Sequence, residues 1–254
     1  MSYYALTFPQ LISQAMALKL NDDAIARLRT GYDLAERMAD GLYRSQGCPF
    51  LNHLVRTASI VLAHGGTLTQ SLAAMLHSAY ILDCFHDSRR RAFRPEDRNG
   101  LSRVVGAEVE EIVWEYHRLG WGKRESIAAH LEQLHSYGPV IKSVLFARLA
   151  NELEDFLDLA MQYRGNYNYR HRVTAIGALC IELADRIGVP GLGQALETAF
   201  EATLSHAIPA PAVREHINAY ELPRRHYHER NLFEYVTTKA GRLMRKLARG
   251  QRQA

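Results

Sequence analysis

GLYRSQGCPFLNHLVRTASIVLAHGGTLTQSLAAMLHSAYILD, residues 41–83, is the stretch that decides the fold. Gly47 supplies backbone freedom and Pro49 cannot continue a helix, so a tight corner is expected at Gly-Cys-Pro. Two amphipathic helices are predicted after this corner, over residues 52–64 and 67–84, because their apolar residues recur with the helical period. The stretch therefore predicts packed helices.

Each of these two helices carries a histidine on its apolar face, His53 and His77. Inward histidines on successive helices are one way in which a helical bundle builds a metal site. Because imidazole titrates near neutral pH, His53 and His77 are also candidate catalytic residues that would act as acid–base groups without a metal. The alternative is that both are polar residues of the fold, each donating to a carbonyl or a neighbouring side chain.

Length and composition indicate a globular protein without disulfides. The chain has 254 residues, of which 47% are hydrophobic, so it can bury a sizeable core. Its three cysteines are scattered and show no metal-binding spacing, which is typical of a reducing compartment. No segment approaches the roughly 20 apolar residues that span a bilayer, and no secretory signal is evident, so we expect a cytoplasmic protein.

The helical period recurs along most of the chain, with almost no strand signal, and predicts an all-α fold. Helices are expected over residues 8–20, 24–46, 52–64, 67–84, 101–119, 125–136, 139–163, 172–187, 195–206, 212–220 and 231–249. Within the helix over 139–163, the acidic residues Glu152, Glu154, Asp155 and Asp158 are expected to face solvent. The His86-Asp87 dipeptide lies beyond the end of a helix, so it is not expected to hold a metal.

A hinge-like YRGNYNY segment over residues 163–169 divides the chain into a helical domain, residues 1–165, and a helical extension, residues 166–254. The extension ends in a basic amphipathic helix over 231–249, and a second group of arginines lies between residues 89 and 98. Basic clusters attract phosphate, acidic lipid or nucleic acid, although a solvated surface is the commoner role. For the last helix we favour packing on its own domain or on a second copy of the chain over a membrane surface or nucleic acid.

Four segments, in order, resemble the HD superfamily, and in particular the hydrolase domain of RelA/SpoT-type guanosine tetraphosphate enzymes. They are GCPFLNHLVRTASIVLAHGG, LAAMLHSAYILD, VVGAEVEEIVWEYHRLG (104–120) and FARLANELEDF (146–156), and the resemblance covers roughly residues 25–165. It implies an HD-domain-like helical bundle with additional C-terminal helices.

The resemblance implies that most of the family's metal site is lost. The positions of its divalent-metal ligands fall on Ala39, His53, His77, Ser78 and Ala147. Two imidazoles remain and both carboxylates are missing, so a hard divalent ion should bind weakly or not at all. The family's catalytic Glu-Asp pair falls on Ile81 and Leu82. We therefore expect no metal, no cofactor and no metal-dependent phosphohydrolase activity.

The resemblance also marks residues for ligand binding. Arg44 falls where the family has an arginine against the guanine base, Asn151 where a residue contacts the ribose, and Arg118 where a lysine lies near the pocket. Together with His53 and His77 these residues would line one cavity, with Arg118 near its rim. The cavity requires that Ala39, Ile81, Leu82 and Ala147 do not close over the histidines.

Three functions remain open from the sequence. The first is a metal-free, hydrolytically inactive HD-like protein that binds a phosphorylated or nucleotide-like ligand or a protein partner. The second is a repurposed HD-fold enzyme, a hydrolase or lyase of a biosynthetic pathway, that uses His53 and His77 as acid–base groups. The third is a protein that binds nucleic acid or a membrane through its basic surface. A homodimer through the C-terminal helix is compatible with each.

Overall fold

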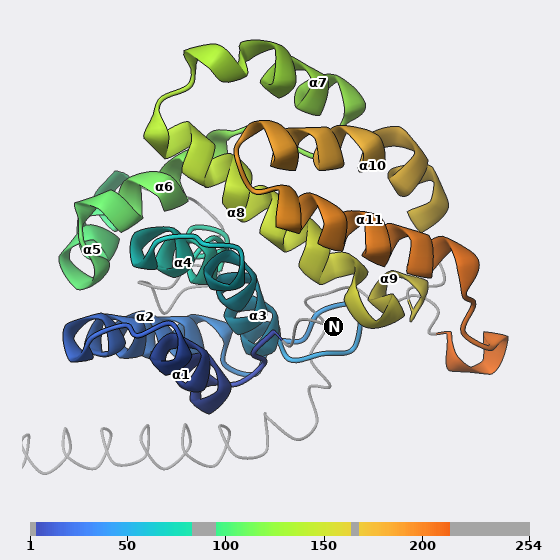
Figure 1. Cartoon of the computed structure of the whole chain (residues 1–254). Helices are drawn as coiled ribbons and strands as arrows, with labels where there is room; N and C mark the ends of the chain where they lie inside the picture. The colour runs from blue at the N-terminus through green and yellow to red at the C-terminus, as the bar shows by residue number, and fades with distance from the viewer. Residues whose placement is uncertain (1–3, 83–94, 164–167, 214–254) are drawn as a thin grey trace, which may run out of the picture. The chain divides into compact units, whose positions relative to one another are not determined.

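The computed structural model describes residues 4–82, 95–163 and 168–213, and its regular structure in these ranges is helical (Figure 1). The described residues all belong to one compact unit, which lies within residues 1–219. The predicted all-α fold is confirmed. The helices of this unit are α1 (Phe8–Ala17), α2 (Asp22–Ala39), α3 (Phe50–Ala63), α4 (Leu68–Met75), α5 (Pro95–Val105), α6 (Ala107–Arg118), α7 (Arg124–Gln133), α8 (Pro139–Phe156), α9 (Ala160–Tyr163), α10 (Tyr169–Arg186) and α11 (Pro190–Ser205), with short 3-10 turns η1 (Leu134–Ser136), η2 (Leu157–Leu159) and η3 (Ala210–Ala212).

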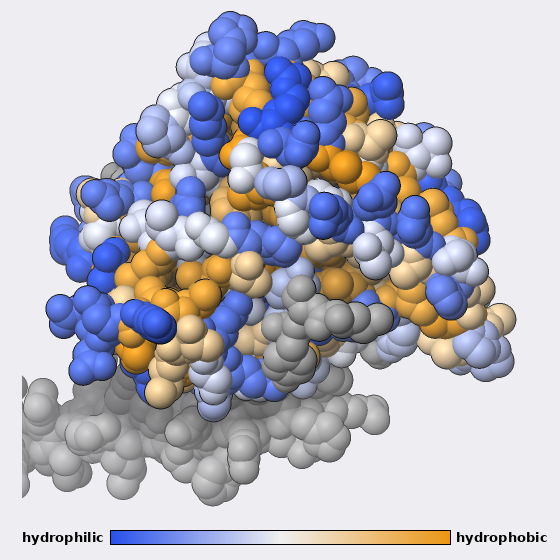
Figure 2. Space-filling model, viewed as in Figure 1, coloured by the Kyte–Doolittle hydropathy of each residue, from blue (hydrophilic) through white to orange (hydrophobic). Residues whose placement is uncertain are grey.

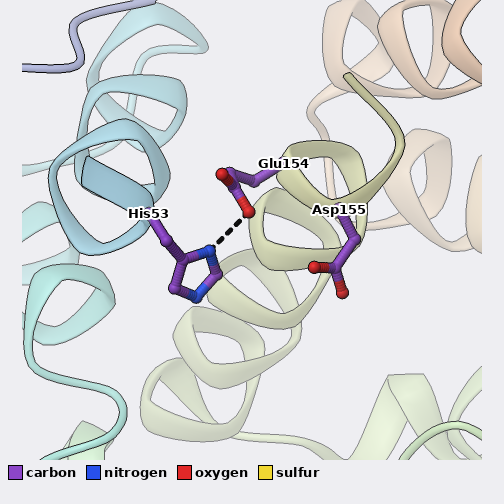
Figure 3. Close-up of side chains that lie close together, drawn as sticks. All are labelled: His53, Glu154 and Asp155. Carbon is purple, nitrogen blue, oxygen red and sulfur yellow. Dashed lines mark hydrogen bonds and ion pairs between the residues drawn. The ribbon is translucent and has the colours of Figure 1, made fainter. Parts of the chain in front are cut away.

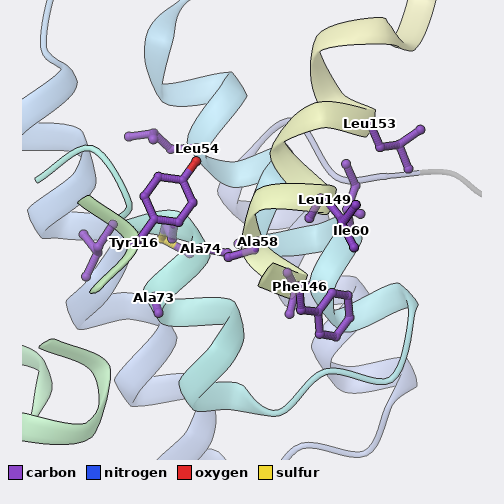
Figure 4. Close-up of a cluster of buried hydrophobic side chains, with 14 of the residues drawn as sticks. Leu54, Ala58, Ile60, Ala73, Ala74, Tyr116, Phe146, Leu149 and Leu153 are labelled. Carbon is purple, nitrogen blue, oxygen red and sulfur yellow. The ribbon is translucent and has the colours of Figure 1, made fainter. Parts of the chain in front are cut away.

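The core forms around α3 and α8, which pack on each other and on α4. Most residues of α3 are buried around the whole helix, as expected for a helix covered on all sides. The Ser71 hydroxyl of α4 donates to the Ala58 carbonyl of α3 at 3.1 Å, so these two helices lie close together; the small side chains of Ala58 and Ala74 are shown in Figure 4. Leu149 and Leu153 of α8 fill the neighbouring space. This packing fixes the relative positions of α3, α4 and α8, which carry most of the site described below.

The chain between α2 and α3 forms the expected corner, but it begins earlier than predicted. α2 ends at Ala39, and residues 40–49 form a tight turn in which the Arg44 N–H donates to the Cys48 carbonyl at 2.9 Å. Gly47 has a φ of 85°, a conformation that L side chains rarely adopt, and the ring of Tyr163 lies against it. The predicted helical segment 40–46 was therefore wrong, and Arg44 projects from a turn.

The helix predicted over 67–84 was also wrong beyond Met75, where α4 ends and residues 76–82 continue as consecutive turns. The His77 Nδ1–H donates to the Ala74 carbonyl at 2.7 Å. In a continuous helix that carbonyl would accept the backbone N–H of Ser78. A side chain that competes for a backbone acceptor explains why the helix ends here.

Two other predicted helices are each divided. Residues 101–119 break at Gly106, which has a φ of 93° and precedes α6. Residues 139–163 break at Asp158 and Leu159, whose φ values are 56° and 58°, so α9 leaves in a new direction after α8. Two consecutive non-glycine residues in the left-handed region are unusual and indicate that the surrounding structure holds this turn.

Of the four acidic residues predicted to face solvent, Asp158 does so, whereas Glu152, Glu154 and Asp155 of α8 lie largely inside. Glu152 is fully buried and Glu154 is only 5% exposed, whereas the Asp158 side chain is 75% exposed. Glu152 receives two hydrogen bonds from Arg172 of α10, at 2.7 and 2.5 Å, and one from the Trp121 indole N–H at 3.3 Å. Paired donors from two other segments explain how a carboxylate is tolerated in the core.

The helices after α9 pack back onto the same unit. α10 lies against α11 and α7, and α11 lies against α8. The amide of the buried Gln162 in α9 donates to the Thr203 and His206 carbonyls, at 2.7 and 2.6 Å, and its oxygen accepts the Ile208 N–H. These bonds attach residues 206–208 to α9.

Several expectations fall outside the described residues. They concern the His86-Asp87 dipeptide, the arginines at 89, 90, 91 and 94, and the basic helix over 231–249. In the face seen in Figure 2, hydrophilic residues lie around apolar patches. No helix in the described part of the chain is long and apolar enough to cross a membrane.

Replacement of Gly106 by alanine is expected to lower the free energy of unfolding by about 1–3 kcal/mol, because this backbone conformation is essentially restricted to glycine. No atom lies within 4 Å of the added Cβ, so the loss would come from the backbone alone. Gly138 is the matched control, since it also precedes a helix with no atom near its Cβ but has a φ of −73°. Chemical denaturation that gives equal losses for the two variants would contradict the explanation.

Replacement of Arg172 by leucine should cost about 3–5 kcal/mol, because it leaves the Glu152 carboxylate buried without its main partner. The double variant Arg172→Leu/Glu152→Leu should be clearly more stable than the single variant, since it removes both charges. Arg186→Leu, which breaks the exposed pair with Glu182, should change stability by less than about 0.5 kcal/mol. A stability loss in Arg172→Leu as small as that in Arg186→Leu would contradict the role assigned to Arg172.

Candidate functional site

The structure brings together Arg44 of the corner, His53 of α3 and His77 after α4, three of the residues marked by the sequence. An Arg44 guanidinium nitrogen lies 2.5 Å from His53 Nδ1. The Nε2 atoms of His53 and His77 are 3.3 Å apart, with their rings nearly perpendicular. The two histidines are only 1% and 5% exposed, so they contact each other and the protein interior.

Two carboxylates from α8 complete this group, and the sequence analysis missed both. Glu154 shares a very short hydrogen bond with His53 Nδ1 (Figure 3). Asp155 accepts a hydrogen bond from Arg44. Asp155 also accepts from the Gln46 amide at 3.1 Å. We call Arg44, His53, His77, Glu154 and Asp155 the buried polar cluster.

The helical period could have found Glu154. It follows the buried Ala147 and Ala150 at spacings of seven and four residues, which places all three on one face of α8. Asp155 is one residue further round the helix and is therefore closer to the surface, with a side chain that is 13% exposed. The acidic composition of the segment concealed this periodicity.

Hydrogen bonding within the cluster fixes where the protons lie. His77 donates its Nδ1–H to a carbonyl, so its Nε2 in the neutral ring is an acceptor. The facing Nε2 of His53 must then carry a proton, which it donates to His77. The Nδ1 atom of His53 is consequently the one that faces Arg44 and Glu154.

Burial shifts the pKa values of these groups in opposite directions. Burial lowers the pKa of His53 well below its usual value, and the positive charges of Arg44 and Arg56 lower it further. Burial likewise lowers the pKa of His77, helped by His53. Burial raises the pKa of Glu154, although Arg44 and Arg56 oppose this shift. Neutral histidines and a proton held between Glu154 and His53 agree with the hydrogen-bond pattern.

The divalent metal implied by the family resemblance does not fit these residues. Ala39 and Ala147 are buried and offer no donor atoms. His53, Glu154 and Asp155 do offer three ligand atoms within 4.8 Å of one another. However, the Arg44 guanidinium lies among them, and a permanent positive charge at this position opposes a cation.

Two of the predicted ligand-binding residues lie apart from these contacts. Arg118 of α6 is 62% exposed, contacts Glu115 at 3.3 Å and lies over the ring of Trp114. Asn151 is half-buried on α8, one turn before Glu154 and Asp155. Ile81 is exposed and Leu82 half-buried, so these two do not form a tight apolar plug.

A pocket of about 430 Å³ lies beside the cluster, and Glu154 is the cluster residue that lines it. Its other polar and charged lining residues are Gln46, Cys48, Asn52, Arg56, Asp158 and Tyr163, and its apolar ones are Leu6, Leu157, Leu159, Ala160, Ile208 and Ala212. Arg44, His53, His77, Asn151 and Arg118 do not line this pocket. Arg56 and Asp158 form an ion pair of 2.8 Å at its wall, and Asp158 is one of the two left-handed residues of η2.

Comparison with known proteins gives one family match. The model of a domain of unknown function, DUF6817, matches residues 34–120. That range includes Arg44, His53 and His77, and it ends before Glu154 and Asp155. No curated protein matches the chain.

The cluster predicts how stability depends on pH. Because the folded pKa values of His53 and His77 lie below those in the unfolded chain, the unfolded state binds more protons as pH falls below about 6.5. Their contribution is present above that pH and declines as pH falls below it towards 5, by up to about 1.4 kcal/mol per pH unit for each histidine. Glu154 has the opposite sign, because stability from a raised pKa is lost as pH rises through that value.

Denaturation of His77→Gln at a series of pH values tests this prediction. The slope of the unfolding free energy against pH should decrease by the equivalent of about one bound proton. His64 is only half-buried, so His64→Gln should change the slope less. Equal slopes in the original protein and His77→Gln would show that His77 does not titrate as described.

Proposed function

We propose that this chain is an HD-like, metal-independent protein that binds a small organic molecule in the pocket beside Glu154. The observation that carries the proposal is the position of Glu154, which lines the pocket and also ends a buried hydrogen-bond chain through His53 and His77 to the Ala74 carbonyl. Ligand sites typically combine a mostly apolar pocket of a few hundred Å³ with a few fixed polar groups.

The charges around the pocket favour a nitrogen base, such as an amine or a nitrogen heterocycle, as the ligand. Arg56 is already paired with Asp158, and Glu154 adds a second carboxyl group. A carboxyl group recognises a nitrogen base in either protonation state, by donating to it or by pairing with its cation. Since Arg56, the one arginine among the residues that line this pocket, is already paired with Asp158, the lining offers little positive charge to hold a ligand with several phosphate charges. The phosphorylated ligand expected from the sequence is therefore the alternative, and the experiment below distinguishes it from a nitrogen base.

The HD-like part of the proposal rests on the four ordered segments described above. It includes an absence of guanosine tetraphosphate hydrolysis, because Ala39, Ser78, Ala147, Ile81 and Leu82 stand at positions where the family has metal ligands or catalytic acids. The match to a domain of unknown function covers the corner through α6 and does not name a chemistry.

The second candidate is an acid–base enzyme, and the continuous hydrogen-bond chain favours it. His53 and His77 are too buried to contact a ligand in this pocket, so Glu154 would exchange the proton with the substrate. The two histidines would then hold and position that proton. Detection of a product by mass spectrometry after incubation with a bound ligand would distinguish catalysis from binding.

Thermal shift and ligand-observed NMR with probes of matched shape test the proposal. Benzylamine should stabilise the protein more than benzyl alcohol, and benzoate least, because the charge at the ring substituent changes from positive to negative. Guanosine should likewise stabilise the protein more than guanosine monophosphate does. Glu154→Gln should abolish the preference, whereas Glu182→Gln, at an exposed carboxylate, should retain it.

Stronger effects from benzoate and guanosine monophosphate would favour the phosphorylated ligand. No stabilisation by any probe at millimolar concentration would contradict binding at this pocket.

A further inference from the structure

Three groups of the buried polar cluster are arranged as metal ligands. His53 Nδ1, Glu154 and Asp155 each direct a ligand atom towards a common region, within 4.8 Å of one another (Figure 3). One imidazole nitrogen and two carboxylates form a donor set that suits Zn²⁺, with a remaining position for water.

The position of the His53 lone pair independently supports a metal-ligand arrangement. His77 accepts at Nε2 because its Nδ1–H is bound to the Ala74 carbonyl, and this assigns the His53 proton to Nε2. The lone pair of His53 Nδ1 therefore faces the two carboxylates. Metal-binding histidines are commonly oriented in this way, by a hydrogen bond from the other ring nitrogen.

The Arg44 guanidinium occupies the region where these groups converge. One of its nitrogens lies beside His53 Nδ1 and 3.6 Å from Glu154, and another donates to Asp155. Guanidinium stays protonated at all accessible pH values, so it supplies a fixed positive charge to groups that would otherwise repel. Both roles of a bound cation, charge balance and the joining of α3 to α8, are thus provided by a side chain.

We infer that Arg44 takes the place of a metal ion, and that removal of its guanidinium converts His53, Glu154 and Asp155 into a Zn²⁺ site. An ion would have a route to the site, because Glu154 and the Asp155 partner Gln46 both line the pocket. The inference does not depend on the ligand proposed above, since it concerns the cluster and a metal alone.

The experiment compares Zn²⁺ binding to the purified full-length protein and to Arg44→Ala, by isothermal titration and by metal analysis after dialysis. The variant should bind one equivalent at least ~100-fold more tightly than the original protein. Arg44→Ala/His53→Ala and Arg44→Ala/Glu154→Gln should lose the gain. Arg56→Ala removes an arginine of the same pocket without vacating the cluster, so it should not acquire the site.

Two further readouts keep the inference testable if Arg44→Ala folds poorly. Zn²⁺ should raise the melting temperature of the variant and leave that of the original protein unchanged, because the ion binds only the folded state. Co²⁺ in place of Zn²⁺ should give visible absorption bands of a low-coordinate site. Arg44→Gln, which keeps a side chain of similar length without the charge, is measured in the same way if the alanine variant does not fold even with Zn²⁺.

Equal Zn²⁺ affinity in the original protein and the variants would overturn the inference. So would binding by Arg44→Ala or Arg44→Gln that survives loss of His53 or Glu154.

Discussion

The cost of burying charge is the constraint on which this structure depends most. Glu154 and His53 lie in contact at the packed boundary between α3 and α8, where an unpaired ionised group would be strongly unfavourable. Arg44, from the corner after α2, provides hydrogen bonds and a positive charge to the polar groups at this boundary. The corner must therefore place one guanidinium accurately, and the Gly47 turn and the backbone bond from Arg44 to Cys48 hold it there.

The same solution recurs elsewhere in the compact unit. Arg172 of α10 meets the buried Glu152 of α8, and Arg98 of α5 meets Glu110 of α6 through two bonds of 2.7 Å. The first pair joins helices that are separate in the sequence, and the second joins two consecutive helices. Because a bidentate arginine–carboxylate pair has a narrow geometry, such pairs constrain how helices are placed more than they add to stability.

The cluster also relates the fold to the proposed function. A purely structural ion pair needs no neighbouring space, yet Glu154 lies at the wall of a 430 Å³ pocket. The pocket is bordered by η2, where Asp158 and Leu159 adopt left-handed conformations, and strain of this kind is often found near functional sites. Arg44 thus balances charge in the interior and Glu154 lines the pocket, and His53 contacts both residues.

The sequence by itself determined the helical fold, the corner at Gly47 and Pro49, and the inward direction of His53 and His77, because these depend on local periodicity and backbone chemistry. Arg44 was found only through a family resemblance. Tertiary structure decided the turn at Asp158 and the partners of the buried Glu152 and Glu154, whereas α4 ends at Met75 through a local competition for a backbone acceptor. The tertiary cases involve an arginine that is distant in the sequence: Arg56 pairs with Asp158, and arginines of the corner and of α10 pair with carboxylates on α8. Sequence alone predicts that a charged residue is exposed, because the partner that would allow its burial is brought to it only by tertiary packing.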